Sequence, residues 1–305
     1  MSLLKAAADL VGLSPNTLVV TVAMAAVGMA AGVVGCFSVL RRQALVGDAA
    51  AHATLPGLAV AFAITGNRGL PVLLLGGAVS AVLSLGVLVL LRRFSRTRED
   101  AATAIVIGVS FGVGVALISG LVARGVPGSG GLERFLLGST ASLSAADAML
   151  LVVVSLVAVG LVAMFLKEAT VVSFDAGFAA AAGWPVWWID FALVATTAVI
   201  VVVGLPAAGA VLVTALVVIP PVAARQWTDR VGVMLLLAGV FGLIAALAGV
   251  ALSATIPGLA TGPMVVLAAA AIFAVSLVFA PKRGLLAVAL RPRQTLTMPP
   301  ERMRP

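Results

Sequence analysis

The chain of 305 residues contains little charge, one cysteine, one histidine and no tyrosine. Charged side chains make up 10% of it, whereas about 25% is usual in a soluble protein. The lone Cys36 excludes a disulfide framework and a CxxC metal site. Because His52 is the only histidine, there is no HExxH motif and no triad to support a serine nucleophile. These absences argue against a soluble enzyme and against a disulfide-stapled secreted domain.

Apolar residues are what the chain has in abundance, with 62% hydrophobic residues and a mean hydropathy of +1.24. A soluble domain of this length could not bury so much apolar surface, so the composition is typical of a polytopic membrane protein. The net charge of +8 does not indicate a nucleic-acid partner, because the basic residues stand in short clusters between apolar runs. That arrangement is the topology signal of membrane proteins.

The apolar runs predict the fold class, since a transmembrane helix needs about 20 apolar residues. The candidates are nine runs: 17–40, 44–65, 70–91, 101–122, 146–166, 187–204, 208–223, 231–252 and 263–280. We therefore expect an all-α, polytopic membrane helix bundle of about nine transmembrane helices. Residues 1–305 would form a single transmembrane domain, with the bundle over 17–281 and a basic tail over 282–305.

Basic residues in the connections predict the orientation. With the Arg41-Arg42 turn in the cytoplasm, only four basic residues fall outside: Lys5, Arg68, Arg124 and Arg134. We expect the N-terminus outside, and the C-terminal tail in the cytoplasm near anionic membrane lipid. The tryptophans then all fall at cytoplasmic helix ends, where such rings favour the membrane interface: Trp184, Trp187, Trp188 and Trp227.

Two ionisable residues lie inside the second apolar run. Asp48 and His52 are four residues apart, so in a helix they share one face. An ionisable residue within a span is costly and is a candidate functional site. A carboxylate with an imidazole suits Mn²⁺, Zn²⁺ or Fe²⁺. Two alternatives stay open, in which Asp48 caps the helix while His52 bonds a neighbouring helix, or the pair relays protons.

Proline and glycine mark possible breaks and close contacts in the spans. Pro56-Gly57 follows His52 by one turn, and a broken helix beside ligands is common in transport sites. Pro220-Pro221 in the seventh run predicts a bend or an early end of that helix. Small residues predict close helix packing in the first and fourth spans. These are Gly28, Gly32, Gly108 and Gly112.

Several segments together resemble the permeases of metal-ion ABC importers, the ABC-3 family. Residues 40–57, LRRQALVGDAAAHATLPG, resemble the family signature most specifically. Residues 209–220, GAVLVTALVVIP, resemble its apolar stretch that ends in proline. Further matches are Ser173-Phe174-Asp175, Phe178-Ala179, Gly183, Ala223-Ala224-Arg225 and Thr261-Gly262-Pro263. The resemblance covers about residues 17–281, and the matching segments also stand in the same order as in the family.

The resemblance implies a fold like that of type II ABC importers and a permease in a bacterial plasma membrane. It implies a homodimer, two separate cytoplasmic ATPase subunits that hold the ATP, and an extracytoplasmic metal-binding protein. The metal would be cargo rather than a tightly bound cofactor, and Asp48 and His52 would line its path. The resemblance does not fix the metal, because manganese and zinc members share the Asp-His motif.

The cytoplasmic loop 167–186 resembles the family segment that contacts the ATPase. We expect a short helix over 174–183 that ends at Gly183, a good C-terminal stop. The coupling residues implied are Phe174, Asp175, Phe178, Ala179 and Gly183. Ala176-Gly177 stands where the family usually has Pro-Glu, so the resemblance does not imply the charged contact to the ATPase that a glutamate would make here.

Other functions are weighed against this one. A permease for iron-siderophore or cobalamin-type chelates would not need an Asp-His pair on a helix. An intramembrane enzyme using Asp48 and His52 lacks a nucleophile constellation, and a gradient-driven carrier would need no ATPase. The longest loops, of about 20 residues, are too short for a catalytic domain, which favours a transporter over an enzyme.

Overall fold

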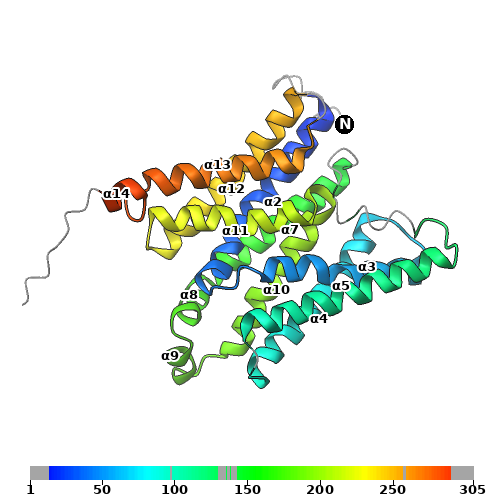
Figure 1. The fold of residues 1–305 in the computed structure, drawn as a ribbon, viewed down its shortest axis with the longest axis horizontal. Helices are drawn as coiled ribbons and strands as arrows, with labels where there is room; N and C mark the ends of the chain where they lie inside the picture. Colours follow the sequence, from blue (N-terminus) through cyan, green and yellow to red (C-terminus); the bar gives the residue numbers. More distant parts are fainter. Residues whose placement is uncertain are drawn as a thin grey trace, which may run out of the picture.

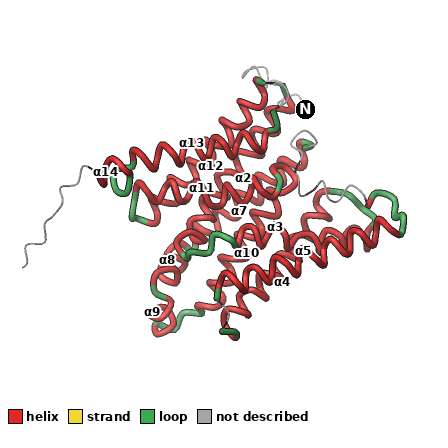
Figure 2. Tube along the Cα trace, viewed as in Figure 1, coloured by secondary structure: helices red, strands yellow, loops and turns green. Residues whose placement is uncertain are grey.

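The computed structural model describes residues 14–96, 98–129, 135, 138, 143–256 and 259–289. Within this part of the chain the regular structure is entirely helical (Figure 2). The helices are α2 (Pro15–Leu40), α3 (Val46–Thr65), α4 (Leu70–Phe94), α5 (Glu99–Ala123), α7 (Ala145–Met164), α8 (Leu166–Phe174), α9 (Ala176–Ala181), α10 (Val186–Ala208), α11 (Ala210–Trp227), α12 (Val231–Thr255), α13 (Thr261–Phe279) and α14 (Leu285–Ala289).

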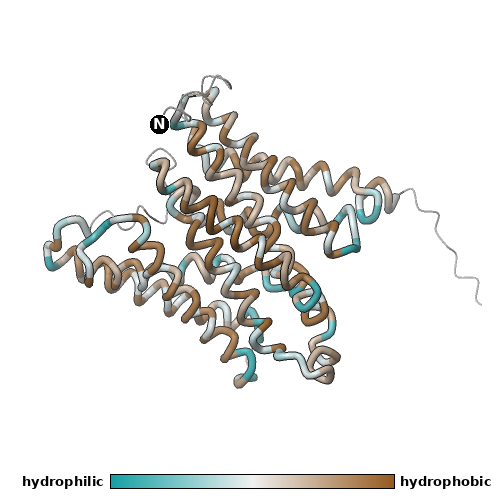
Figure 3. The backbone as a smooth tube through the Cα atoms, turned by 180° about the vertical axis from the view of Figure 1, so that it is seen from behind, coloured by the Kyte–Doolittle hydropathy of each residue, from teal (hydrophilic) through white to brown (hydrophobic). Residues whose placement is uncertain are grey.

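Nine of the described helices are long and apolar enough to cross a membrane, and they match the nine predicted runs one by one. Charged and polar residues gather at their ends and in the turns (Figure 3). One end of the bundle carries Arg41, Arg92, Lys167, Arg225 and Lys282, and we call it the basic end. The four tryptophans also stand at helix ends on this side, in the turn after α9, the first turn of α10 and the last residue of α11.

Local sequence explains several helix starts. Ser14 accepts a hydrogen bond from the Thr17 backbone N–H, and Pro15 occupies the first turn of α2. Ser144 and Asp147 form a reciprocal capping box at the start of α7.

Helix α2 occupies the centre of one group of helices, packed against α7, α10, α11 and α12 (Figure 1). Two glycines make the contact with α12 possible. A Cβ at Gly28 would lie 2.6 Å from the carbonyl oxygen of Gly242, and one at Gly32 would overlap the Ala238 carbonyl. The prediction of close packing is confirmed for these two residues. It is wrong for Gly108 and Gly112, where a Cβ would meet nothing within 4 Å, because they face away from the rest of the chain.

Helix α3 lies between α4 and α5 and also contacts α10 and α11. Glycine again sets the spacing on both sides. A Cβ at Gly57 would overlap the Gly76 carbonyl oxygen on α4, and Gly114 of α5 packs against Leu55. The helix that carries Asp48 and His52 is therefore held at short range by two neighbours.

The prolines do not end their helices. Helix α3 continues through Pro56 to Thr65, and α11 continues through Pro220 and Pro221 to Trp227. The predicted early end at Pro220-Pro221 is therefore wrong, because both prolines are buried and tertiary packing keeps the helix going. The predicted tail begins with the short helix α14, and residues 290–305 lie outside the described residues.

Candidate functional site

Asp48 and His52 lie in the first two turns of α3, at the basic end of the bundle. Asp48 Oδ1 and His52 Nε2 are 3.6 Å apart, and their side chains are 43% and 29% exposed. The carboxylate occupies the third helical position, where the helix dipole favours a negative charge. The predicted shared face is therefore present, and both side chains are reachable from outside the fold.

The structure gives little support to a purely structural role for the pair. The N-cap of α3 is Leu45, and no side-chain cap hydrogen bond is made there. The Nδ1 atom of His52 is buried without a hydrogen-bond partner among the described residues. Its ring stands edge-on to Phe111 of α5, with 5.3 Å between the ring centroids. The nitrogen that faces the Asp48 carboxylate is Nε2, so this atom and the carboxylate together form the ligand pair.

Alanine explains how α3 places this pair. Ala49, Ala50 and Ala53 are fully buried and form the face that packs into the bundle. On the same side, a Cβ added at Gly47 would lie 3.6 Å from Val217 of α11, which is an ordinary van der Waals distance. The small residues let α3 approach its neighbours closely, so the opposite face carries the two ionisable side chains.

The Asp-His face continues along α3 at four-residue intervals through Pro56, Val60 and Ile64. Val60 is 45% exposed and Ile64 is 79% exposed. Ala51 and Leu55, in contrast, are buried within this chain. Val60 and Ile64, rather than Ala51 and Leu55, therefore mark the open face of α3.

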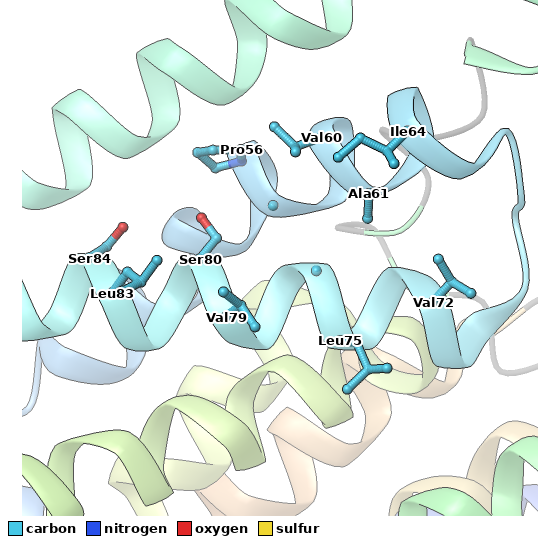
Figure 4. A pocket seen from close by; sticks show the side chains of 12 residues that line it. Pro56, Val60, Ala61, Ile64, Val72, Leu75, Val79, Ser80, Leu83 and Ser84 are labelled. Atoms are coloured by element: carbon cyan, nitrogen blue, oxygen red, sulfur yellow. The ribbon is translucent and has the colours of Figure 1, made fainter.

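A groove runs along each side of this face. The groove toward α4 holds about 540 Å³ and is lined almost entirely by apolar side chains, with Ser80 and Ser84 as its polar members (Figure 4). The groove toward α5 holds about 250 Å³, and Arg124 lies at one end of it. An apolar face flanked by two grooves is unfinished packing within a single copy of the chain.

The predicted coupling helix is present but shorter than expected, over Ala176–Ala181 rather than 174–183. Phe174 ends α8, and Asp175 separates the two helices as the N-cap of α9, accepting from the Phe178 backbone N–H at 2.8 Å. Gly183 has a φ of +80° just after the C-cap. The Trp184 N–H bonds the Ala179 carbonyl and the Gly183 N–H bonds Ala180, which is a Schellman motif. The expected stop at Gly183 is therefore confirmed.

Aromatic side chains project from this short helix pair. Phe174 is 60% exposed and Phe178 is 63% exposed, while Ala179 is buried against the fold. Trp188, in the first turn of α10, is exposed to a similar extent. The basic end therefore presents an aromatic surface, which we call the α9 surface and define by Phe174, Phe178 and Trp188.

Sequence reasoning missed an ion pair that ties the two regions together. Asp190 of α10 pairs with Arg41, the C-cap of α2, and both side chains are less than one-fifth exposed. Burial lowers the pKa of Arg41 to about 10, with Arg92 lowering it further and Glu99 opposing the shift. The guanidinium stays charged at neutral pH. No local signal in the sequence joins residues 149 positions apart.

A second ion pair lies next to the first. Glu99 at the start of α5 accepts from the side chain of Gln43 at 3.0 Å and lies 3.5 Å from the Arg92 Nε atom. The turn between α2 and α3 is therefore tied to α4, α5 and α10 by side chains. Among the described residues, no group of three or more His, Cys, Asp or Glu side chains could hold a metal. One copy of the chain thus offers the Asp-His pair alone.

Comparison with known proteins decides the family. The model of the family described as "ABC 3 transport family" matches residues 15–280. This chain belongs to the ABC 3 transport family. It is therefore a membrane subunit of an ABC transporter rather than an enzyme, and the resemblance noted from its motifs is confirmed.

Relatives of this chain are named as metal transport proteins. It is 41% identical over 277 residues to the "Manganese transport system membrane protein MntC" of Bacillus subtilis, covering 91% of this chain and 64% of that protein. It is 40% identical over 259 residues to the "Zinc transport system membrane protein TroC" of Treponema pallidum, covering 85% and 87%. The chain thus spans less than two thirds of the Bacillus protein's length.

A solved structure has the same fold. The structure described as "PsaBC from Streptococcus pneumoniae in complex with Fab" matches with a TM-score of 0.76 and 28% identity, covering 88% of this chain and 94% of that one. The predicted fold class, an all-helical ABC importer bundle, is confirmed.

Proposed function

We propose that this chain is the permease of an ATP-driven importer of divalent transition metal ions, Mn²⁺, Zn²⁺ or Fe²⁺. Residues 17–281 form its transmembrane permease domain, and 282–305 form a basic cytoplasmic tail. The observation that carries the proposal is the partly exposed Asp48–His52 pair, whose carboxylate oxygen and Nε2 atom lie 3.6 Å apart. The names of the manganese and zinc relatives support the same cargo.

The proposed importer contains two copies of the chain. One copy offers two side-chain ligands, whereas a divalent transition metal usually takes four to six. A two-fold axis beside α3 would bring two Asp-His pairs together. The open face through Val60 and Ile64, with its two grooves, supports this arrangement, because a second copy would cover it.

Metal held at such a site is cargo, so its coordination is weak and reversible. Pro56 has no N–H, and the His52 carbonyl therefore lacks its usual helical donor. We propose that Pro56 and Gly57 let α3 adjust around the ion, as at the broken helices of transport sites. Pro220 and Pro221 are buried in α11, and a gating role for them remains a prediction.

The α9 surface is the proposed docking site for the ATPase. Two separate ATPase subunits bind the ATP, one for each permease copy, and no cofactor is held tightly by the permease itself. Phenyl rings that are exposed on a capped helix can insert as a rigid unit into a groove on a partner protein. The coupling residues are Phe174, Asp175, Phe178, Ala179 and Gly183.

The orientation follows from charge. The basic end faces the cytoplasm of a bacterial cell, with the N-terminus outside. An extracytoplasmic metal-binding protein delivers the ion at the opposite end.

Replacing His52 by Ala tests the proposed function. Import of Mn²⁺ into vesicles by the reconstituted complex should be lost, while the ATPase subunits still co-purify and hydrolyse ATP. Phe111→Leu is the matched control, because it alters the neighbour of the imidazole without removing a ligand atom. Normal import by the His52 variant would refute the ligand role.

A further inference from the structure

We propose that the Arg41–Asp190 ion pair transmits movement from the coupling helix α9 to the start of α3, and so sets the position of Asp48 and His52. The inference rests on the proposed function, and it assigns positioning roles to two residues outside the metal pair and the α9 surface. The contacts run from α9 through Asp190 and Arg41 to α3.

The first step joins α9 to Asp190. Helix α9 ends at Ala181, and α10 begins at Val186 after a short connection. The Schellman motif at Gly183 and a bond from the Val186 N–H to the Trp184 carbonyl fix that connection. Asp190 lies one turn into α10. A displacement of α9 therefore reaches Asp190 through a short backbone path with few free torsions.

The second step joins Arg41 to α3. Backbone bonds hold the connection in place, from Arg41 to Phe37, from Gln43 to Ser38 at 2.7 Å and from Val46 to Gln43 at 3.1 Å. Arg42 has a φ of +59°, a conformation that non-glycine residues rarely adopt. This turn is a stiff unit, so a force applied at Arg41 moves the first turn of α3.

The third step is the strength of the link between the two. The side chains of Arg41 and Asp190 are 14% and 19% exposed, so salt screens this pair less than an exposed one. The neighbouring Arg92 guanidinium disfavours the charge on Arg41, whereas the Glu99 carboxylate favours it. The Nε and Nη1 atoms of Arg92 are buried without a hydrogen bond among the described residues, although Nε lies 3.5 Å from Glu99 Oε1. The charged groups around Arg41 are therefore not all tied by hydrogen bonds.

A position between two sites does not by itself prove coupling. The measurement that supplies the proof is the amount of Mn²⁺ imported per ATP hydrolysed by the reconstituted complex. Asp190→Asn and Arg41→Gln should each lower this ratio by about tenfold, with ATP hydrolysis preserved. The double variant Arg41→Asp with Asp190→Arg should recover most of it, because the swap restores the pair.

The matched control is Asp229→Asn. Asp229 also lies at the basic end, but its ion pairs are with Arg225, Lys282 and Arg283, so its replacement should leave the ratio unchanged. An unchanged ratio in Asp190→Asn overturns the inference. A proportional loss of hydrolysis and import would also overturn it, because such a loss marks a merely structural pair. A double variant that imports no more Mn²⁺ per ATP than the single variants would overturn it as well.

A second readout separates this inference from the proposed function. A cysteine at Leu45 reports on the start of α3, because Leu45 is the N-cap of that helix and is 51% exposed, and the native Cys36 is buried. Its labelling rate should change on addition of ATP in the wild-type background and should not change with Asp190→Asn. This result does not depend on metal. Loss of the metal role of His52 would leave it standing, whereas an ATP response that survives Asp190→Asn contradicts the link.

Discussion

Removal of the α9 cap by Asp175→Ala should weaken coupling by an amount that follows from one hydrogen bond. The bond from the Phe178 N–H to Asp175 Oδ1, at 2.8 Å, stabilises a helix of six residues. Loss of such a cap costs about 1 kcal/mol, which changes a population about fivefold. If an ordered α9 is needed for docking, metal import should fall by roughly that factor, about fivefold.

Two further variants test whether loss of the helix cap explains the loss of import. Asp175→Ser keeps a capping oxygen and should retain most of the import activity. Gly177→Ala should partly restore activity to Asp175→Ala, because alanine favours helix by about 0.5–1 kcal/mol over glycine. There is room for the added methyl, whose nearest neighbour would be Asp175 Oδ1 at 3.4 Å.

The assay is Mn²⁺ uptake by reconstituted complexes, with co-purification of the ATPase measured alongside. Undiminished uptake by Asp175→Ala would refute the docking role of the helix. Equal loss in the alanine and serine variants would refute the capping explanation.

Other predictions concern the same surfaces. Gly183→Val should lower uptake more than Asp175→Ala, because a β-branched residue resists a φ of +80°; equal uptake would contradict the stop. A cysteine at Phe178 should cross-link to the ATPase, and labelling of that cysteine from outside intact cells would instead reverse the topology. Cysteines at Val60 or Ile64 should form disulfides between two permease copies in membranes, and a complex with one permease per ATPase pair would exclude the dimer. Gly28→Ala should lower the unfolding temperature in detergent, since overpacking costs about 1–3 kcal/mol, whereas Gly108→Ala has open space and should not; equal shifts would contradict the packing.

The nine spans could be predicted from the sequence because lipid imposes one simple rule, a long apolar run for each crossing. Helix ends were predictable where a cap or a stop is local, as at Asp175 and Gly183. The continuation of α11 through Pro220 and Pro221 could not be predicted, because it depends on the surrounding helices rather than on the prolines themselves.

Part of the candidate site could likewise be predicted from the sequence, and part of it could not. The Asp48–His52 face follows from a spacing of four residues, so it could be predicted without the fold. The direction of that face could not be predicted, because it depends on which helices pack against α3. The Arg41–Asp190 pair depends on which helices become neighbours, and nothing near Asp190 in the sequence distinguishes it from an ordinary residue near a helix end.

The central claim is that a metal ion passes between two copies of α3 in contact with His52. Because His52 is the only histidine in the chain, labelling the permease alone with nitrogen-15 histidine marks a single position in each copy. Pulsed electron paramagnetic resonance on frozen, Mn²⁺-loaded complexes should then show nitrogen-15 coupling from two equivalent imidazoles, lost in His52→Ala. A bound Mn²⁺ signal with no coupling to the labelled chain would contradict the claim.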